Sequence, residues 1–95
     1  MIEYIYDAIK ATAGENVEVT AVITDEAGEF ITEGCGFMLH DQNGDMIYKI
    51  QGVYADNLWS FIIPAELTNG LRGKYEYCIC DTKGSLCFRK PFYLV

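Results

Sequence analysis

The chain has 95 residues, of which 51% are apolar and 22% are charged. This length is typical of one domain, so we expect a single domain over residues 1–95. The apolar content is too high for a disordered chain, and no apolar run reaches the roughly 18–20 residues of a membrane span. No basic segment precedes an apolar stretch as in a secretory signal. So small a chain has little room for an elaborate active site, which favours a protein that is not an enzyme.

The net charge is −7, from 14 acids and 7 bases, and it divides unevenly along the chain. Residues 1–48 carry ten acids and only Lys10, a charge of −9, whereas residues 49–95 carry +2. An acidic protein repels phosphate backbones, so we expect no nucleic-acid partner. Such an uneven division is typical of a solvated acidic surface. Alternatively, the charge asymmetry orients head-to-tail contacts between copies of the protein.

Turn signals are dense and regular. Glycine, asparagine and aspartate gather at residues 13–16, 25–28, 41–45, 55–57, 68–70 and 81–84. Alternation of apolar and polar residues between these turns predicts strands. The predicted strands are 17–24, 34–40, 46–51, 58–63, 74–80, 86–89 and 91–95. Residues 2–11 are ambiguous between strand and helix, and their aromatic residues favour a strand.

One short helical turn is expected at Pro64–Leu67, because proline suits a first helical position and Asn69–Gly70 suits the end of a helix. Leu67 and Leu71 then cover one end of the core. Seven to eight short antiparallel strands in a chain of this length form a sandwich or a small barrel.

The segment Leu71–Tyr77 favours the sandwich. Its Gly-x-Tyr resembles the tyrosine corner of immunoglobulin-like folds, in which the tyrosine hydroxyl bonds to nearby backbone. The resemblance implies that Gly73 and Tyr75 form a structural corner, and that the fold is an immunoglobulin-like β-sandwich. Trp59 lies on a strand too late in the chain for the cysteine–tryptophan–cysteine framework of antibody domains, so that class is excluded.

The four cysteines allow three interpretations. If Thr82 and Lys83 form a hairpin tip, Cys78 lies opposite Cys87, and the two form a strained cross-strand disulfide. Alternatively, Cys78 and Cys87 bind a metal together with Cys35 or His40. The spacing of Cys78 and Cys80 differs from the two-residue spacing of structural zinc sites, and disulfides are rare in the cytosol. We therefore expect plain thiols, with no metal and no cofactor.

Two further features suggest chemistry but have simpler explanations. His40, the only histidine, is a candidate general base, although no triad partners it and we expect it to face solvent at a strand end. Asp41–Asp45 resembles a calcium loop. Glycine is fourth rather than sixth, and Gly52 stands where the twelfth-position glutamate belongs, so the segment predicts a hairpin turn.

Aromatic residues are the remaining candidates for binding. With Tyr75 and Tyr77 directed inward, four other tyrosines are candidates for partial exposure: Tyr4, Tyr6, Tyr54 and Tyr93. Exposed aromatic rings suit protein interfaces and sugar stacking, and the alternative is that they form the rim of a small core.

The overall layout resembles the immunoglobulin-like domains of tailed-phage virion proteins, above all the amino-terminal domain of baseplate upper proteins and related head-fibre or capsid-decoration domains. The resemblance rests on five segments: Ala13–Asn16, Val22–Gly28, Phe37–Asp45, Phe61–Leu71 and Arg72–Tyr77. Such domains have no catalytic residues. The four cysteines depart from that pattern, and so does a chain that ends with the sandwich.

The sequence thus leads to the hypothesis of a non-enzymatic structural, adaptor or decoration protein of a phage particle. It would be made in the host cytoplasm and would contact other virion proteins, or further copies of itself, through sheet edges or its less acidic carboxyl-terminal part. The alternative is a carbohydrate-binding module that uses exposed Trp59 or tyrosines. A third reading is a thiol or metal protein.

Overall fold

The computed structural model describes residues 2–5, 8–85 and 89–95, with the backbone alone for residues 3–5 and 85. These residues contain ten strand segments and one short helix. In chain order they are β1 (Ile2–Ile5), β2 (Ala8–Ala11), β3 (Val17–Ala21), β4 (Gly36–His40), β5 (Met46–Gln51), β6 (Val53–Ala55), β7 (Leu58–Ile63), α1 (Ala65–Thr68), β8 (Gly73–Asp81), β9 (Gly84–Ser85) and β10 (Lys90–Leu94).

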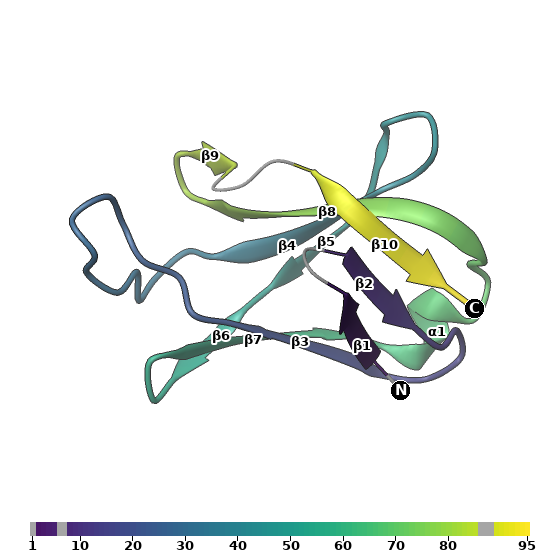
Figure 1. Ribbon diagram of the computed structural model, residues 1–95, viewed down its shortest axis with the longest axis horizontal. Helices are drawn as coiled ribbons and strands as arrows, with labels where there is room; N and C mark the ends of the chain where they lie inside the picture. Colours follow the sequence, from purple (N-terminus) through teal and green to yellow (C-terminus); the bar gives the residue numbers. More distant parts are fainter. Residues whose placement is uncertain (1, 6–7, 86–88) are drawn as a thin grey trace.

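The strands form two sheets, drawn one above the other in Figure 1. The seven-stranded sheet has the order β1–β2–β10–β8–β4–β5, with β9 also paired to β8. The three-stranded sheet has the order β3–β7–β6. The pairs are antiparallel except β2 with β10, which run parallel with Phe92 opposite Ile9. The first and last parts of the chain are thereby joined.

The described residues of the segment 2–11 are extended, as predicted, but they form two strands rather than one. β1 and β2 pair antiparallel, with Ile2 opposite Ala11 and Ile5 opposite Ala8. This division and the short β6 raise the number of strands above the seven to eight expected. The predicted strand at 86–89 lies largely outside the described residues.

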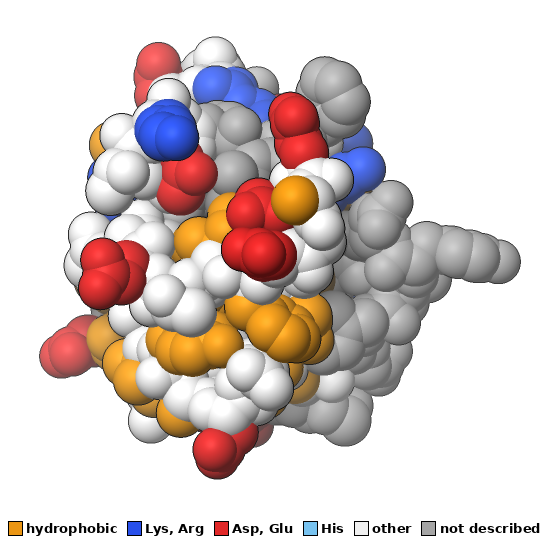
Figure 2. Space-filling view, turned by 90° about the vertical axis from the view of Figure 1, so that its left-hand side faces the viewer, with side chains coloured by type: hydrophobic (Ala, Val, Ile, Leu, Met, Phe, Trp, Pro, Cys, Tyr) orange, Lys and Arg blue, Asp and Glu red, His pale blue; other side chains and the backbone are white. Residues whose placement is uncertain are grey.

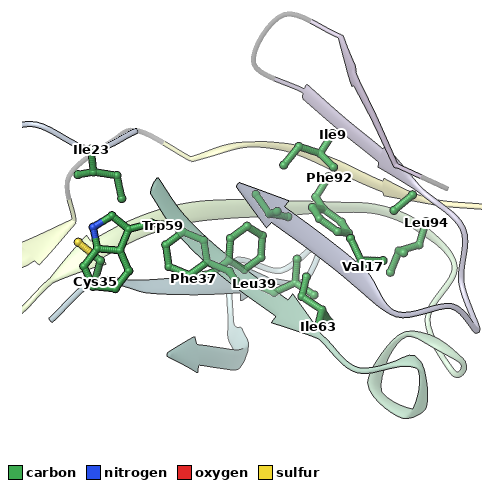
Figure 3. Packing of buried hydrophobic residues seen from close by; sticks show 13 residues of the cluster. Ile9, Val17, Ile23, Cys35, Phe37, Leu39, Trp59, Ile63, Phe92 and Leu94 are labelled. Carbon is green, nitrogen blue, oxygen red and sulfur yellow. The ribbon is translucent and has the colours of Figure 1, made fainter. Parts of the chain in front are cut away.

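The core lies between the sheets and is built from the predicted alternation. Val17 and Val19 of β3 and Trp59, Phe61 and Ile63 of β7 are buried, while their neighbours along each strand are more exposed. Phe37 of β4 lies at the centre (Figure 3). Its ring centroid lies 5.2 Å from Tyr77, 5.9 Å from Phe92 and 6.0 Å from Phe61. Aromatic packing across both sheets therefore holds the sandwich together.

Helix α1 closes one end of the core beside the carboxyl terminus (Figure 1). Pro64 is its N-cap in an extended conformation, so the helix begins at Ala65, one residue later than predicted, and Asn69 is its C-cap. The buried hydroxyl of Thr68 accepts the N–H of Gly14 at 3.0 Å and lies 3.0 Å from the carbonyl oxygen of Glu15. Leu67 and Leu71 pack against the core as expected. No helix among the described residues is long and apolar enough to cross a membrane.

Three turns share one construction. Asp25, Asp41 and Asp81 each accept the backbone N–H two residues on, and a second N–H three or four residues on. The glycine three residues after each aspartate has a positive φ, which side chains disfavour. The carboxylate of Asp41 is thus occupied in closing the β4–β5 hairpin, and the hairpin prediction for residues 41–45 is confirmed.

Candidate binding surface

The outer face of the three-stranded sheet carries apolar side chains away from the core. Because side chains alternate along a strand, burial of Trp59, Phe61 and Ile63 turns Leu58 and Ile62 to the outside. On β6, Val53 and Ala55 are likewise exposed, while Tyr54 between them packs against the core. We call the exposed set Val22, Val53, Ala55, Leu58 and Ile62 the outer apolar face.

The outer apolar face extends over the three strands, with Thr20 and Ser60 in the row between Leu58 and Ile62. Leu58 lies opposite Ala55 on β6, and on the other side Val22 directly follows Ala21, the last paired residue of β3, whose partner is Trp59. Val53 is 65%, Ile62 51% and Leu58 37% exposed. Single exposed apolar residues are ordinary, but a contiguous group with a polar border marks an interaction surface.

The chain segments that form this sheet and its loops carry an excess of acidic residues. The segments that supply the three-stranded sheet and its loops, residues 12–35 and 52–70, hold eight acids and no base, a formal charge of −8. The remaining segments hold six acids and seven bases, a formal charge of +1, which restores the total of −7. In Figure 2 the blue side chains lie in the upper part, where red ones also occur, and the lower part, at the level of the three-stranded sheet, shows orange and red side chains.

Of the four predicted tyrosines, the two whose side chains the structure describes, Tyr54 and Tyr93, lie on different sheets. Tyr54 packs against Trp59 with a centroid distance of 5.5 Å, and its hydroxyl donates to Asn57 Oδ1 at 3.0 Å. Tyr93 is 38% exposed on β10 of the other sheet. Only the backbone of Tyr4 is described, and Tyr6 lies outside the described residues.

Trp59 is not available to stack on a sugar, contrary to the carbohydrate interpretation. It is 3% exposed, and its Nε1 donates to the carbonyl oxygen of Ile31 at 2.6 Å. The alternation that buries Phe61 also buries Trp59, two residues before it. Through this hydrogen bond to Ile31, the indole of Trp59 connects the long loop after β3 to the three-stranded sheet.

The predicted corner residues lie at the start of β8. The Tyr75 hydroxyl accepts the N–H of Arg72 and lies in position to donate to the Arg72 carbonyl oxygen, each at 3.2 Å. Gly73 has φ +102°, a conformation that favours glycine. The hydroxyl thus bonds to backbone three residues upstream, as in the corner that the sequence resembles.

We expect Tyr75→Phe to lower the free energy of unfolding by about 0.5–1.5 kcal/mol, because it removes the hydroxyl and leaves the ring in place. Urea denaturation of the wild type and the variant measures this difference. The matched control is Tyr93→Phe on an exposed tyrosine, for which we expect a change within about 0.5 kcal/mol. Equal stability of Tyr75→Phe and the wild type would contradict a structural role for the corner.

His40 is buried rather than directed to solvent, which corrects the sequence prediction. It is 4% exposed, and its Nδ1 has no hydrogen-bond partner among the described residues. β4 lies between β5 and β8, with His40 opposite Met46 and Glu76, so the end of this strand is not free. Burial lowers the pKa of His40, and nearby Arg89 lowers it further against the opposing effects of Glu76 and Asp41.

The pKa of His40 predicts how stability changes with pH. Above pH of about 6.5 the histidine is neutral in both states and contributes no slope. As the pH falls below that value, the unfolded chain binds the proton first, so the folded state loses stability. We expect His40→Gln to reduce this loss between about pH 7.5 and about pH 5.5, measured by urea denaturation at both values. Identical losses in the wild type and the variant would contradict the prediction.

The cysteines do not form a described metal site. Cys35, Cys78 and Cys80 are buried, and Cys80 Sγ lies 3.6 Å from the carbonyl oxygen of Gly36. Burial raises the pKa of the Cys35 thiol, with Asp81 and Cys80 adding to the effect. Among the described residues no three histidine, cysteine or acidic side chains gather as metal ligands. The proposed pair of Cys78 with Cys87 falls outside the described residues.

A small depression lies where β8 begins beside the β4–β5 turn. It has a volume of about 190 Å³, and Asp41, Gln42, Lys74, Tyr75 and Glu76 line it. Small-molecule sites are mostly apolar and of roughly 300–1,000 Å³. The depression is therefore smaller and more polar than a typical ligand pocket, and the outer apolar face is the better candidate for binding.

Comparison with known proteins identifies the fold. No protein-family model and no curated protein matches the sequence. The structure is similar to the crystal structure of the Lin-41 filamin domain, with a TM-score of 0.63 and 12% sequence identity over 90% of this chain and 82% of that one. Likeness at this identity shows the fold alone. The protein is an all-β, immunoglobulin-like β-sandwich with one short helix, as the sequence predicted.

Proposed function

We propose that the protein is a non-enzymatic structural or adaptor protein that acts through protein–protein contacts, and that the outer apolar face is its binding surface. The observation that carries this proposal is the exposure of Val22, Val53, Leu58 and Ile62 on one side of a sheet whose other side is the core. Covering such side chains removes apolar surface from water, which favours association.

The sequence resemblance extends the proposal to the location. A small immunoglobulin-like sandwich of this layout suits a decoration, fibre-base or adaptor protein of a tailed-phage particle, made in the host cytoplasm and attached to other virion proteins. The segments that carry the resemblance are turns and strands, and the similarity to a filamin domain adds support for the fold only. The acidic layer disfavours nucleic acid as the partner.

Mass spectrometry of purified virions tests the location, and variants test the surface. We expect the wild type in the particles and an at least about tenfold lower incorporation of the double variant Leu58→Ser, Ile62→Ser. Met46→Ser is the matched control, since Met46 is 53% exposed on an edge strand of the other sheet. Absence of the protein from virions would refute the phage location, and normal incorporation of the folded double variant would refute the surface.

A further inference from the structure

We infer that the outer apolar face selects a partner protein that presents an apolar surface flanked by lysine or arginine. This inference rests on the proposed function and adds the chemistry of the partner. Two observations carry it: the apolar residues share one exposed sheet face, and the chain segments that form this sheet and its loops, residues 12–35 and 52–70, hold eight acids and no base. The exposed apolar residues require an apolar surface on the partner, and the acidic residues favour lysine or arginine beside that surface.

The apolar part of the surface has a defined arrangement on the three strands. Leu58 and Ala55 form one row, with Val22 just beyond the end of β3, and Val53 and Ile62 belong to the next two rows. Ser60 lies between Leu58 and Ile62 along β7, where it pairs with Val53. The surface is thus a sheet face with a short polar interruption, which suits a flat apolar partner surface rather than an inserted side chain.

Acidic side chains border this arrangement and enter it. Glu18 of β3 is exposed directly opposite Ile62, and Asp56 is exposed in the turn between Ala55 and Leu58. The loop that follows Val22 carries four more exposed acids, Asp25, Glu26, Glu29 and Glu33, but it leaves the sheet toward the β8–β9 turn, where Gly34 lies beside Thr82 (Figure 1). A partner that covers the apolar residues must approach the carboxylates of Glu18 and Asp56, and lysine or arginine at its rim makes that approach favourable.

The same charges argue against other occupants. Phosphate backbones and anionic membrane surfaces are repelled by a layer of charge −8. A two-fold contact between copies places Glu18 and Asp56 of one copy against the same acidic layer of the other, which opposes association. A separate basic partner is the remaining class that satisfies both the apolar and the charged parts of the surface.

Two synthetic amphipathic peptides test the inference. They share one leucine pattern and differ only in carrying lysine or glutamate at the polar positions. In fluorescence anisotropy with the whole protein, we expect the lysine peptide to bind at least about tenfold more tightly than the glutamate peptide. We expect its affinity to fall about tenfold between about 0.05 M and about 0.5 M salt, because exposed charges are screened.

Variants locate the binding. We expect Leu58→Ser with Ile62→Ser to weaken the lysine peptide at least about tenfold, and Met46→Ser to leave it unchanged. Glu18→Gln with Asp56→Asn is expected to reduce the preference for lysine over glutamate at least about threefold, whereas Asp45→Asn in the β4–β5 turn is not. Circular dichroism confirms that each variant is folded.

The outcomes separate the inference from the proposed function. Equal binding of both peptides, lost together in the Leu58→Ser, Ile62→Ser variant, leaves an apolar docking face and overturns the basic partner. Binding that this variant does not weaken, or no binding by either peptide, overturns the face itself and the proposed function with it. Self-association in sedimentation equilibrium that this variant abolishes identifies a second copy as the occupant and overturns the inferred partner.

Discussion

Replacing Phe37 with alanine is expected to lower the free energy of unfolding by about 3–5 kcal/mol, the range observed for large cavities in cores. Phe37 is fully buried and lies at the centre of the aromatic cluster, in contact with Tyr77, Phe92 and Phe61. These rings come from β7, β8 and β10, so the side chain joins both sheets. Their fixed backbones prevent collapse into the space that the phenyl ring leaves.

Chemical denaturation of the wild type and the variant, compared by midpoint and slope, measures the effect. The matched control is Phe30→Ala, because Phe30 is 46% exposed in the loop after β3. We expect this control to change stability by less than about 1 kcal/mol. Similar losses for the two phenylalanine variants would show that the core is not centred on Phe37.

The second large effect is expected for Gly52→Ala, at the junction between β5 and β6. A Cβ built on Gly52 would lie 2.6 Å from both Phe61 Cε1 and Trp59 Cε3. Both rings are packed in the core, and the indole is also held by its bond to Ile31. The added methyl group must displace a ring or the backbone, and we expect a loss of about 1–3 kcal/mol, the usual cost of overpacking.

Gly70→Ala is the control for this substitution. A Cβ at Gly70 has no neighbouring atom within 4 Å. Because alanine restricts the unfolded chain more than glycine, we expect this variant to be unchanged or stabilised by up to about 1 kcal/mol. Thermal unfolding of the two variants side by side measures both effects. A Gly52→Ala protein as stable as Gly70→Ala would contradict the close approach of the rings.

The sequence predicted the parts of the fold that depend on local patterns. Alternation identified the buried sides of β3 and β7, because a sheet with one face on a core repeats every two residues. The aspartate and glycine signals at Asp25, Asp41 and Asp81 identified the turns for a comparable reason, since the carboxylate and the positive φ act within four residues. Local chemistry was enough in both cases.

Other features of the fold depend on contacts between segments that are far apart in the sequence. His40 was expected in solvent because nothing in its neighbourhood along the chain shows that β4 becomes an interior strand between β5 and β8. The parallel pairing of β2 with β10 joins segments about eighty residues apart, beyond the reach of any local pattern. Trp59 was considered for sugar binding although the alternation with Phe61 and Ile63 already indicated burial.

The candidate surface was also hidden in the sequence, because its members come from three strands. The charges of the two sequence halves, −9 for residues 1–48 and +2 for residues 49–95, are similar to those of the segments that form the two sheets. The boundary at residue 48, however, does not coincide with the division between the sheets. The relevant boundary is between the two sheets, with −8 on one layer and +1 on the other. Only pairing of β3, β7 and β6 brings Val22, Leu58 and Val53 together beside that charge.

Methyl NMR locates the binding surface most directly, since Val22, Val53, Leu58 and Ile62 all carry methyl groups. On titration with the lysine–leucine peptide, we expect these four residues to show the largest chemical-shift changes. Val95, which is 59% exposed at the end of the other sheet, serves as the reference and should remain unchanged. Shifts that centre on Val95 or on Met46, with the methyl groups of Leu58 and Ile62 unperturbed, would contradict the assignment of the outer apolar face as the binding surface.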